Sequence, residues 1–241
     1  MGFDSKVKKC AKGCEYSKDR KIDGKIKTHP ISVLQAFEEI KKTKNVEEIT
    51  GEEWFEKSKQ IHKEKFGGFN DKGFNPNHLK SLLEFYCAGK IELLQKLVAE
   101  NNFKKAFYLV KDEIKGIGHK VAKFIIRDLI FLLTEWGKDE KIYRIYSKEE
   151  LVYALPVDIW VRRIALSIPI IGDKVMESLK KTDLVDKVDD KIDEKISMVI
   201  AEKCCEMGLN PLLFDFGAYL FGRNKIKRKE SIDEIYKILT G

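Results

Sequence analysis

Residues 114–127, IKGIGHKVAKFIIR, hold the groups in this chain best suited to binding an anion. Gly116 and Gly118 flank one apolar residue, which predicts a tight turn between two helices with both glycines at positive φ. Amide groups at such a turn, and at the start of the next helix, point outward, where they can hold a phosphate oxygen. Basic side chains surround this position: Lys111, Lys115, His119 and Lys123. The stretch therefore predicts a phosphate-binding hairpin.

Two motifs in a fixed order make this chain resemble the helix-hairpin-helix superfamily of base-excision DNA glycosylases. The family's hairpin reads Φ-x-G-Φ-G-x-K, where Φ is apolar and the lysine opens the second helix; Lys120 stands at that lysine. The second motif, Φ-P-V-D-x-x-Φ-x-R, contains an aspartate that caps a later helix. Residues 155–163, LPVDIWVRR, match it and place Asp158 at the aspartate. Residues 210–218 are similar to the family's late core helix.

The resemblance implies an all-α fold of two helical lobes with the active-site cleft between them. One lobe is expected over residues 46–128, ending in the helix-hairpin-helix of residues 103–128. The other is expected to combine residues 1–45 with residues 129–241 and to carry the catalytic aspartate.

Two departures from the family pattern narrow the resemblance. The gap between Lys120 and Asp158 is 158 − 120 = 38 residues, wider than is usual in the family. The excess, residues 135–154, is charged and has its own capping box, so we expect an extra loop and a short helix there. This enlarged gap is closest in kind to archaeal 8-oxoguanine glycosylases. Nothing after Cys205 supplies a four-cysteine loop, so no iron–sulfur cluster or other cofactor is expected, although a monovalent cation at the hairpin stays open.

The resemblance assigns the chemistry to Lys120 and Asp158. A neutral Lys120 amine would attack C1′ of a damaged nucleotide, expel the base and form a Schiff base, after which β-elimination breaks the strand. A helix N-terminus and an apolar cleft would both favour the neutral amine. An ionised Asp158 would stabilise positive charge on the sugar. The alternatives are a surface lysine that contacts phosphate and an aspartate that is a structural cap.

Further site residues follow from the same resemblance. The implied phosphate contacts are Gly116, Gly118, His119, Lys123 and Arg162. Phe124 lies one turn after Lys120, so it could stack on the extruded base or belong to the core. Trp160 is the other base-pocket candidate, although it stands where some relatives carry a phosphate-binding histidine. No metal ligands are assigned.

The elements around these residues read as helices throughout, ten or more of them. Residues 30–40 place their apolar side chains on one helical stripe. Asn75 precedes Pro76, the order of a cap residue and a first-turn proline. Residues 210–222 are apolar nearly all round, which predicts a buried helix. Capping boxes predict helix starts at residues 50–53, 147–150 and 231–234.

Composition fits a DNA-binding protein without proving one. The chain has 241 residues, 46 Lys+Arg against 39 Asp+Glu, and a net charge of +7. No apolar run approaches the roughly 20 residues that cross a bilayer, and no signal-peptide core follows Met1. Five cysteines, an odd number, indicate reduced thiols. We expect a cytoplasmic, nucleoid-associated monomer without membrane contact.

The sequence thus predicts a bifunctional DNA glycosylase and AP lyase that excises 8-oxoguanine from damaged double-stranded DNA. The alternatives are an oxidised-pyrimidine glycosylase and a non-catalytic helix-hairpin-helix DNA-binding protein. Two features stay without assignment. The Phe- and Gly-rich loop at residues 66–75 could enter DNA or pack on the core, and Cys10 and Cys14 lack two further metal ligands.

Overall fold

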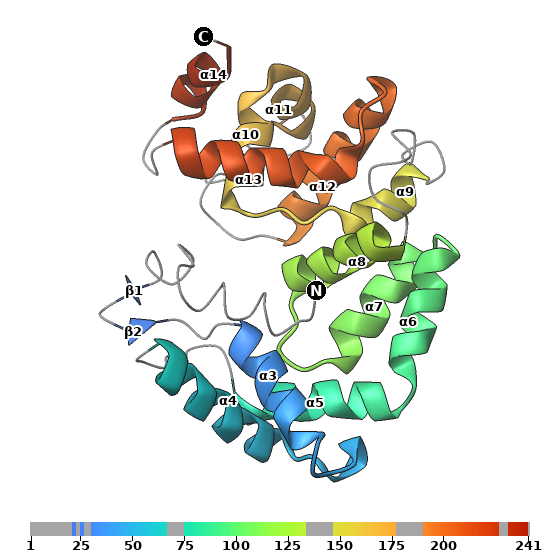
Figure 1. Ribbon diagram of the computed structural model, residues 1–241. Coiled ribbons are helices and arrows are strands. Elements are labelled where there is room, and N and C mark those ends of the chain that lie inside the picture. Colours follow the sequence, from blue (N-terminus) through green and yellow to red (C-terminus); the bar gives the residue numbers. More distant parts are fainter. Residues whose placement is uncertain are drawn as a thin grey trace. The chain divides into compact units, whose positions relative to one another are not determined.

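The computed structural model describes residues 21–22, 25–26, 30–66, 75–133, 147–176, 190–226 and 231–240 (Figure 1). Within these ranges nearly every regular element is a helix, so the all-α prediction is confirmed. The exception is a two-residue antiparallel pair, β1 (Lys21–Ile22) with β2 (Lys25–Ile26). The Phe- and Gly-rich loop between residues 67 and 74, the segment around Cys10 and Cys14, and most of the expected extra loop lie outside the described residues.

The chain divides into two compact units, of which the first comprises Met1–Ile91 and Glu113–Gly116. Its helices are α3 (Pro30–Ile40), the 3-10 turn η1 (Val46–Glu48), α4 (Gly51–Phe66) and α5 (Pro76–Cys87). α4 packs against both α3 and α5, and the Trp54 indole donates to the Val33 carbonyl at 2.8 Å. The apolar core of this unit is Ala36, Ile40, Ile49, Trp54, Phe55, Ile61, Leu79 and Leu83.

The second unit comprises Glu92–Asp112 and Ile117–Gly241. It holds most of α6 (Lys90–Ala99) and α7 (Phe103–Glu113), then α8 (His119–Leu133), α9 (Lys148–Leu151) and η3 (Val152–Ala154). The remaining helices are α10 (Ile159–Ser167), α11 (Pro169–Met176), α12 (Asp190–Glu206), η4 (Pro211–Leu213), α13 (Phe214–Lys225) and α14 (Ile232–Thr240). α10 is central, because α11, α12, α13 and α14 all pack on it (Figure 1). It is buried from Val161 to Ser167.

The boundaries of these two units differ from those of the expected lobes, which were residues 46–128 and the rest of the chain. α3 belongs with α4 because Ala36 and Ile40 share one apolar core with Trp54. α8 belongs with the second unit because it packs on η3.

Helix starts follow the predicted caps closely. Asn75 Oδ1 accepts from the amides of Asn77 and His78, and Pro76 occupies the first turn. The box at Ser231 is complete, since Ser231 and Glu234 each bind the other's amide. At Ser147 the capping box has one of its two hydrogen bonds, the one from the Glu150 amide to the Ser147 hydroxyl. The Glu150 carboxylate accepts instead from the Lys104 amide at 2.8 Å.

Residues 210–222 are mostly helical, as predicted, but the prediction that this helix is buried is wrong. η4 and α13 occupy this stretch, but Leu220 is 57% exposed and Tyr219 40% exposed. One face of α13 packs on α10, while Tyr219 lines two surface hollows described below.

Candidate active site

The predicted helix–turn–helix forms between α7 and α8, with one glycine in the expected conformation. Gly116 has φ +82°, which confirms its positive φ. Gly118 is not among the described glycines with positive φ, so that part of the prediction is wrong. Its carbonyl already accepts the Ala122 amide at 3.0 Å, which places Gly118 at the start of α8 in ordinary backbone geometry.

The turn is anchored to α5 within the first unit. The Lys115 amide donates to the Ser81 hydroxyl at 3.0 Å. The His78 ring lies directly against Gly116, and its Nε2 is 3.2 Å from the Asn75 side-chain nitrogen. The backbone at Gly116 is therefore held from one side by α5.

The first turn of α8 has amide groups and a basic side chain that could bind an anion. The first amides of a helix have no carbonyl partner in a preceding turn, and Gly118 carries no side chain that could accept from them. Lys120 is exposed in this first turn. His119 is directed elsewhere, because its Nε2 is 3.6 Å from Asp190 Oδ2 and its ring meets the Phe107 ring edge-on.

A hollow of about 480 Å³ in the second unit brings Lys120 and Asp158 to one surface. Its walls come from the start of α8, the segment before α10, the first turn of α10, α12 and Tyr219 of α13. The lining residues are Gly118, His119, Lys120, Val121, Lys123, Val157, Asp158, Ile159, Trp160, Arg162, Asp190, Asp193 and Tyr219.

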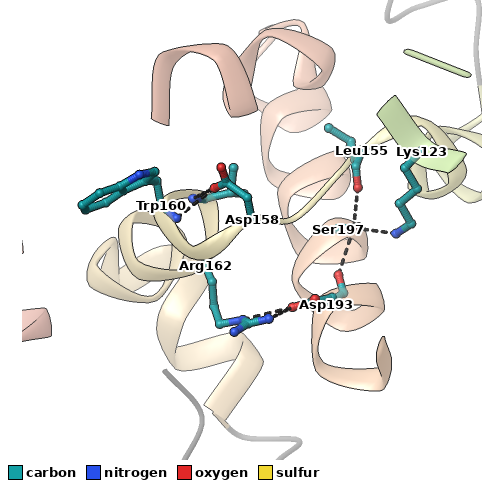
Figure 2. Close-up of polar contacts among 8 residues, drawn as sticks. Lys123, Leu155, Asp158, Trp160, Arg162, Asp193 and Ser197 are labelled. Carbon is teal, nitrogen blue, oxygen red and sulfur yellow. Dashed lines mark hydrogen bonds and ion pairs between the residues drawn. The ribbon is translucent and has the colours of Figure 1, made fainter. Parts of the chain in front are cut away.

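Asp158 is the N-cap of α10, as predicted. Its Oδ1 accepts from the amides of Trp160 at 2.8 Å and Val161 at 2.9 Å (Figure 2). The cap uses one carboxylate oxygen for both amides, so Oδ2 lies outside the cap. Asp158 is half-buried, which leaves part of the carboxylate at the surface of the hollow.

Two lysines one turn apart on α8 have opposite environments. Lys120 is exposed, so without DNA its amine lacks the apolar surroundings that the sequence predicted. Lys123 is only 5% exposed, and its Nζ donates to Ser197 Oγ at 2.9 Å. Burial lowers the pKa of Lys123 to about 8, against the opposing effect of acidic side chains on α12. Lys123 is therefore not placed as the surface phosphate contact that the sequence predicted.

Arg162 also differs from its predicted place. It is 3% exposed, and Nε and Nη2 donate to Asp193 Oδ1 at 3.0 and 2.6 Å (Figure 2). Burial raises the pKa of Asp193, and the Arg162 bonds oppose that rise. The guanidinium is thus committed to an internal ion pair and not presented to a solvent phosphate.

A smaller hollow of about 240 Å³ adjoins the first and shares Asp158 and Tyr219 with it. Its other lining residues are Phe124, Arg127, Asp215 and Phe216. The Arg127 guanidinium lies over both phenylalanine rings, 4.7 Å from the centroid of Phe124 and 4.2 Å from that of Phe216. It also pairs with the buried Asp215 carboxylate.

Asp215 is the most perturbed carboxyl at these hollows. Burial raises its pKa to about 6, with Arg127 opposing and Asp158 adding to the rise. Its Oδ1 is buried and has no hydrogen-bond partner within the described part of the chain. Asp215 lines the smaller hollow, although this oxygen is itself buried.

The two predicted base-pocket residues line different hollows. Phe124 lines the smaller one and Trp160 the larger one. The Trp160 ring packs on the backbone of α13 at Gly222, where an added Cβ would lie 2.8 Å from ring atoms. Of the two, only Phe124 lies beside the Arg127–Asp215 pair.

Sequence reasoning missed Arg127, Asp215, Tyr219 and Ser197. A charge inside an otherwise apolar helical stretch was the available signal for Arg127 and Asp215. Ser197 carries no signal, because its role depends on a contact with a residue 74 positions away.

No family model, curated protein or solved structure was found to match this chain. The described ranges also contain no group of three His, Cys, Asp or Glu side chains that could hold a metal ion. Among the described helices, none has the length and apolarity needed to span a bilayer.

Proposed function

We propose that this chain is a two-lobed helix-hairpin-helix DNA glycosylase and AP lyase, with damaged double-stranded DNA as its partner. The observation that carries the proposal is the shared hollow of Lys120 and Asp158, each at the first turn of a helix. An amine and a capped carboxylate on the surface of one hollow, together with a helix N-terminus that can bind an anion, suit attack at an anomeric carbon.

The reaction would use Lys120 as nucleophile. Its neutral amine forms a bond to C1′ while the glycosidic C–N bond breaks, and the base leaves with the electron pair and takes up a proton. The attached nitrogen loses a proton, and the C1′–O4′ bond then breaks as O4′ takes up a proton, so that the C1′=N bond of the Schiff base forms. Loss of a C2′ proton from this imine then expels the 3′ phosphate. Since Lys120 is exposed, its desolvation would come from DNA covering the hollow.

Asp158 would stabilise the positive charge that develops on the sugar. Its Oδ1 is occupied by the amides of Trp160 and Val161, which hold the carboxylate in one orientation. The oxygen outside the cap is the one available to the sugar.

The smaller hollow suits an extruded base. Phe124 would offer an aromatic face, and the guanidinium of the Arg127–Asp215 pair would offer donors to the base edge. Donors and acceptors on adjacent positions are common to oxidised guanine and oxidised pyrimidines, so the choice between them rests on the 38-residue gap between Lys120 and Asp158, which resembles that of 8-oxoguanine glycosylases. The proposed preference is therefore oxidised guanine.

Borohydride trapping tests the proposal. Duplexes containing 8-oxoguanine, thymine glycol or an abasic site are incubated with the protein and sodium borohydride. We expect a covalent adduct on the 8-oxoguanine duplex, and its loss in Lys120→Ala. An adduct on thymine glycol alone would favour an oxidised-pyrimidine enzyme. DNA binding without any adduct would favour a non-catalytic hairpin protein.

A further inference from the structure

The burial and hydrogen bond of Lys123 are not those of a surface lysine that binds phosphate. Lys123 is the second amine of the larger hollow, and its Nζ donates to Ser197 Oγ on α12 at 2.9 Å. Ser197 Oγ in turn lies 2.9 Å from the Leu155 carbonyl and 2.9 Å from the Asp193 carbonyl of its own helix, and its single proton is shared between these two acceptors (Figure 2). Lys123, Ser197 and Leu155 are all buried. A chain of two hydrogen bonds thus connects α8 with the segment that leads into Asp158.

Leu155 is a sensitive point in that segment. Two residues, Pro156 and Val157, lie between it and Asp158, and the stretch between η3 and α10 belongs to no helix. Pro156 fixes its own φ and has no amide to donate. A fixed Leu155 carbonyl therefore limits where the Asp158 backbone can lie.

A second side chain of α12, Asp193, binds the first turn of α10. Asp193 lies one turn before Ser197 on α12 and binds Arg162 of α10. The same face of α12 therefore holds the segment before Asp158 through Ser197 and the first turn of α10 through Asp193 (Figure 2).

An amine is an unfavourable choice for this buried position if stability alone matters. Burial lowers the pKa of Lys123 to about 8, which means that the folded chain disfavours the ammonium form. An apolar side chain of similar length would avoid that penalty. A buried amine that lowers stability is a candidate for a role in the reaction.

We propose that Lys123 is a positioning residue which, through Ser197 and the Leu155 carbonyl, sets the place of the Asp158 carboxylate relative to Lys120. Lys120 and Lys123 are neighbours on α8 at i and i+3. The hydrogen bonds of Lys123 therefore connect the segment before Asp158 to the helix that carries the proposed nucleophile. The effect on reaction rate rests on the proposed function, whereas the effect on the Asp158 segment does not.

The test compares Lys123→Met, Ser197→Ala and the double variant with Lys105→Met, an exposed lysine of α7 that lines neither hollow. Hydrogen exchange is followed by NMR at the Trp160 and Val161 amides, which Asp158 holds. In Lys123→Met we expect exchange at these amides to be about tenfold faster, while core amides of α12 keep their rates.

Single-turnover base release and DNA affinity are measured on the same variants. Release should fall by about tenfold or more while affinity stays within about twofold, because positioning acts on the chemical step. The double variant should match Lys123→Met, because both changes break one connection. Lys105→Met should behave as the unmodified chain.

Three results would overturn the proposal: unchanged exchange at Trp160 and Val161 in Lys123→Met, additive effects in the double variant, or a trapped DNA adduct that maps to Lys123 itself. If Lys123→Met does not fold, Ser197→Ala and Lys123→Gln provide the same comparison. Absence of base release and adduct in the unmodified chain would refute the proposed function, and the exchange rates would still decide the role of Lys123.

Discussion

Gly116 and His78 lie so close that a Cβ added at Gly116 would fall 2.3 Å from the Nε2 of the His78 ring. The glycine is required twice at this point, once for its φ of +82° and once for the space that the ring occupies. Gly118, two residues later, is required for neither reason, since an added Cβ would meet nothing within 4 Å.

The two glycines therefore form a matched pair for mutagenesis. Gly116→Ala should lower the free energy of unfolding by about 2 kcal/mol or more, through left-handed strain and contact with the ring. Gly118→Ala should change it by less than about 1 kcal/mol. Urea unfolding of both variants checks this. Equal losses would mean that the ring contact does not constrain the turn.

Substitutions can separate two contributions of Asp158, the helix cap and the negative charge. Asparagine is an equally good N-cap, so Asp158→Asn should keep the stability of α10 within about 0.5 kcal/mol. Base release should fall by about a hundredfold or more, because the neutral amide cannot stabilise a cationic sugar. Asp158→Ala should lose both the activity and about 1 kcal/mol of stability. Single-turnover release and thermal unfolding separate the two contributions, and unchanged release in Asp158→Asn would leave only a structural cap.

Lys123 predicts a particular dependence of stability on pH. Its folded pKa of about 8 lies below the ordinary 10.5, so the unfolded chain binds more protons between these values. The unfavourable contribution is fully present below pH 8 and disappears as pH rises toward 10.5. Relative to Lys123→Met, the unmodified chain should therefore gain on the order of 3 kcal/mol across this window. Unfolding free energies at several pH values between 7 and 10.5, compared between the two proteins, check the sign. A flat difference would show that the Lys123 amine is not buried in solution.

The Arg127–Asp215 pair predicts a different pH effect. Arg127→Met would leave the Asp215 carboxylate buried without its cation, which costs about 3–5 kcal/mol near neutral pH. Burial already raises the pKa of Asp215 to about 6, and loss of Arg127 removes the main opposing effect. Asp215 would then fold in its neutral form at acidic pH. The variant's deficit should therefore be smaller below pH 6 than at neutral pH, measured by urea unfolding at both. The double variant Arg127→Met with Asp215→Asn should lose most of that dependence.

What the sequence predicted well is local. The caps at Asn75 and Asp158 and the turn at Gly116 depend on residues within three or four positions, and the structure has each of them. What it missed depends on distance along the chain. Ser197 meets Lys123 across 74 residues, and Asp215 meets Arg127 across 88.

Burial was the least predictable property of the site residues. Lysines at positions 120 and 123 look equivalent in the sequence, yet one is exposed and the other is inside. Lys123 meets Ser197 of α12, whereas Lys120 faces solvent, and no pattern within α8 contains that information.

The Glu150 carboxylate binds the Lys104 amide at the first turn of α7, the helix that leads into the Gly116 turn. Glu150 lies between Lys120 and Asp158 in the chain. A deletion between these two residues that included Glu150 would therefore remove this bond. A shortened chain would have to provide another acceptor for the start of α7, so the length of this connection and the stability of the hairpin are constrained together.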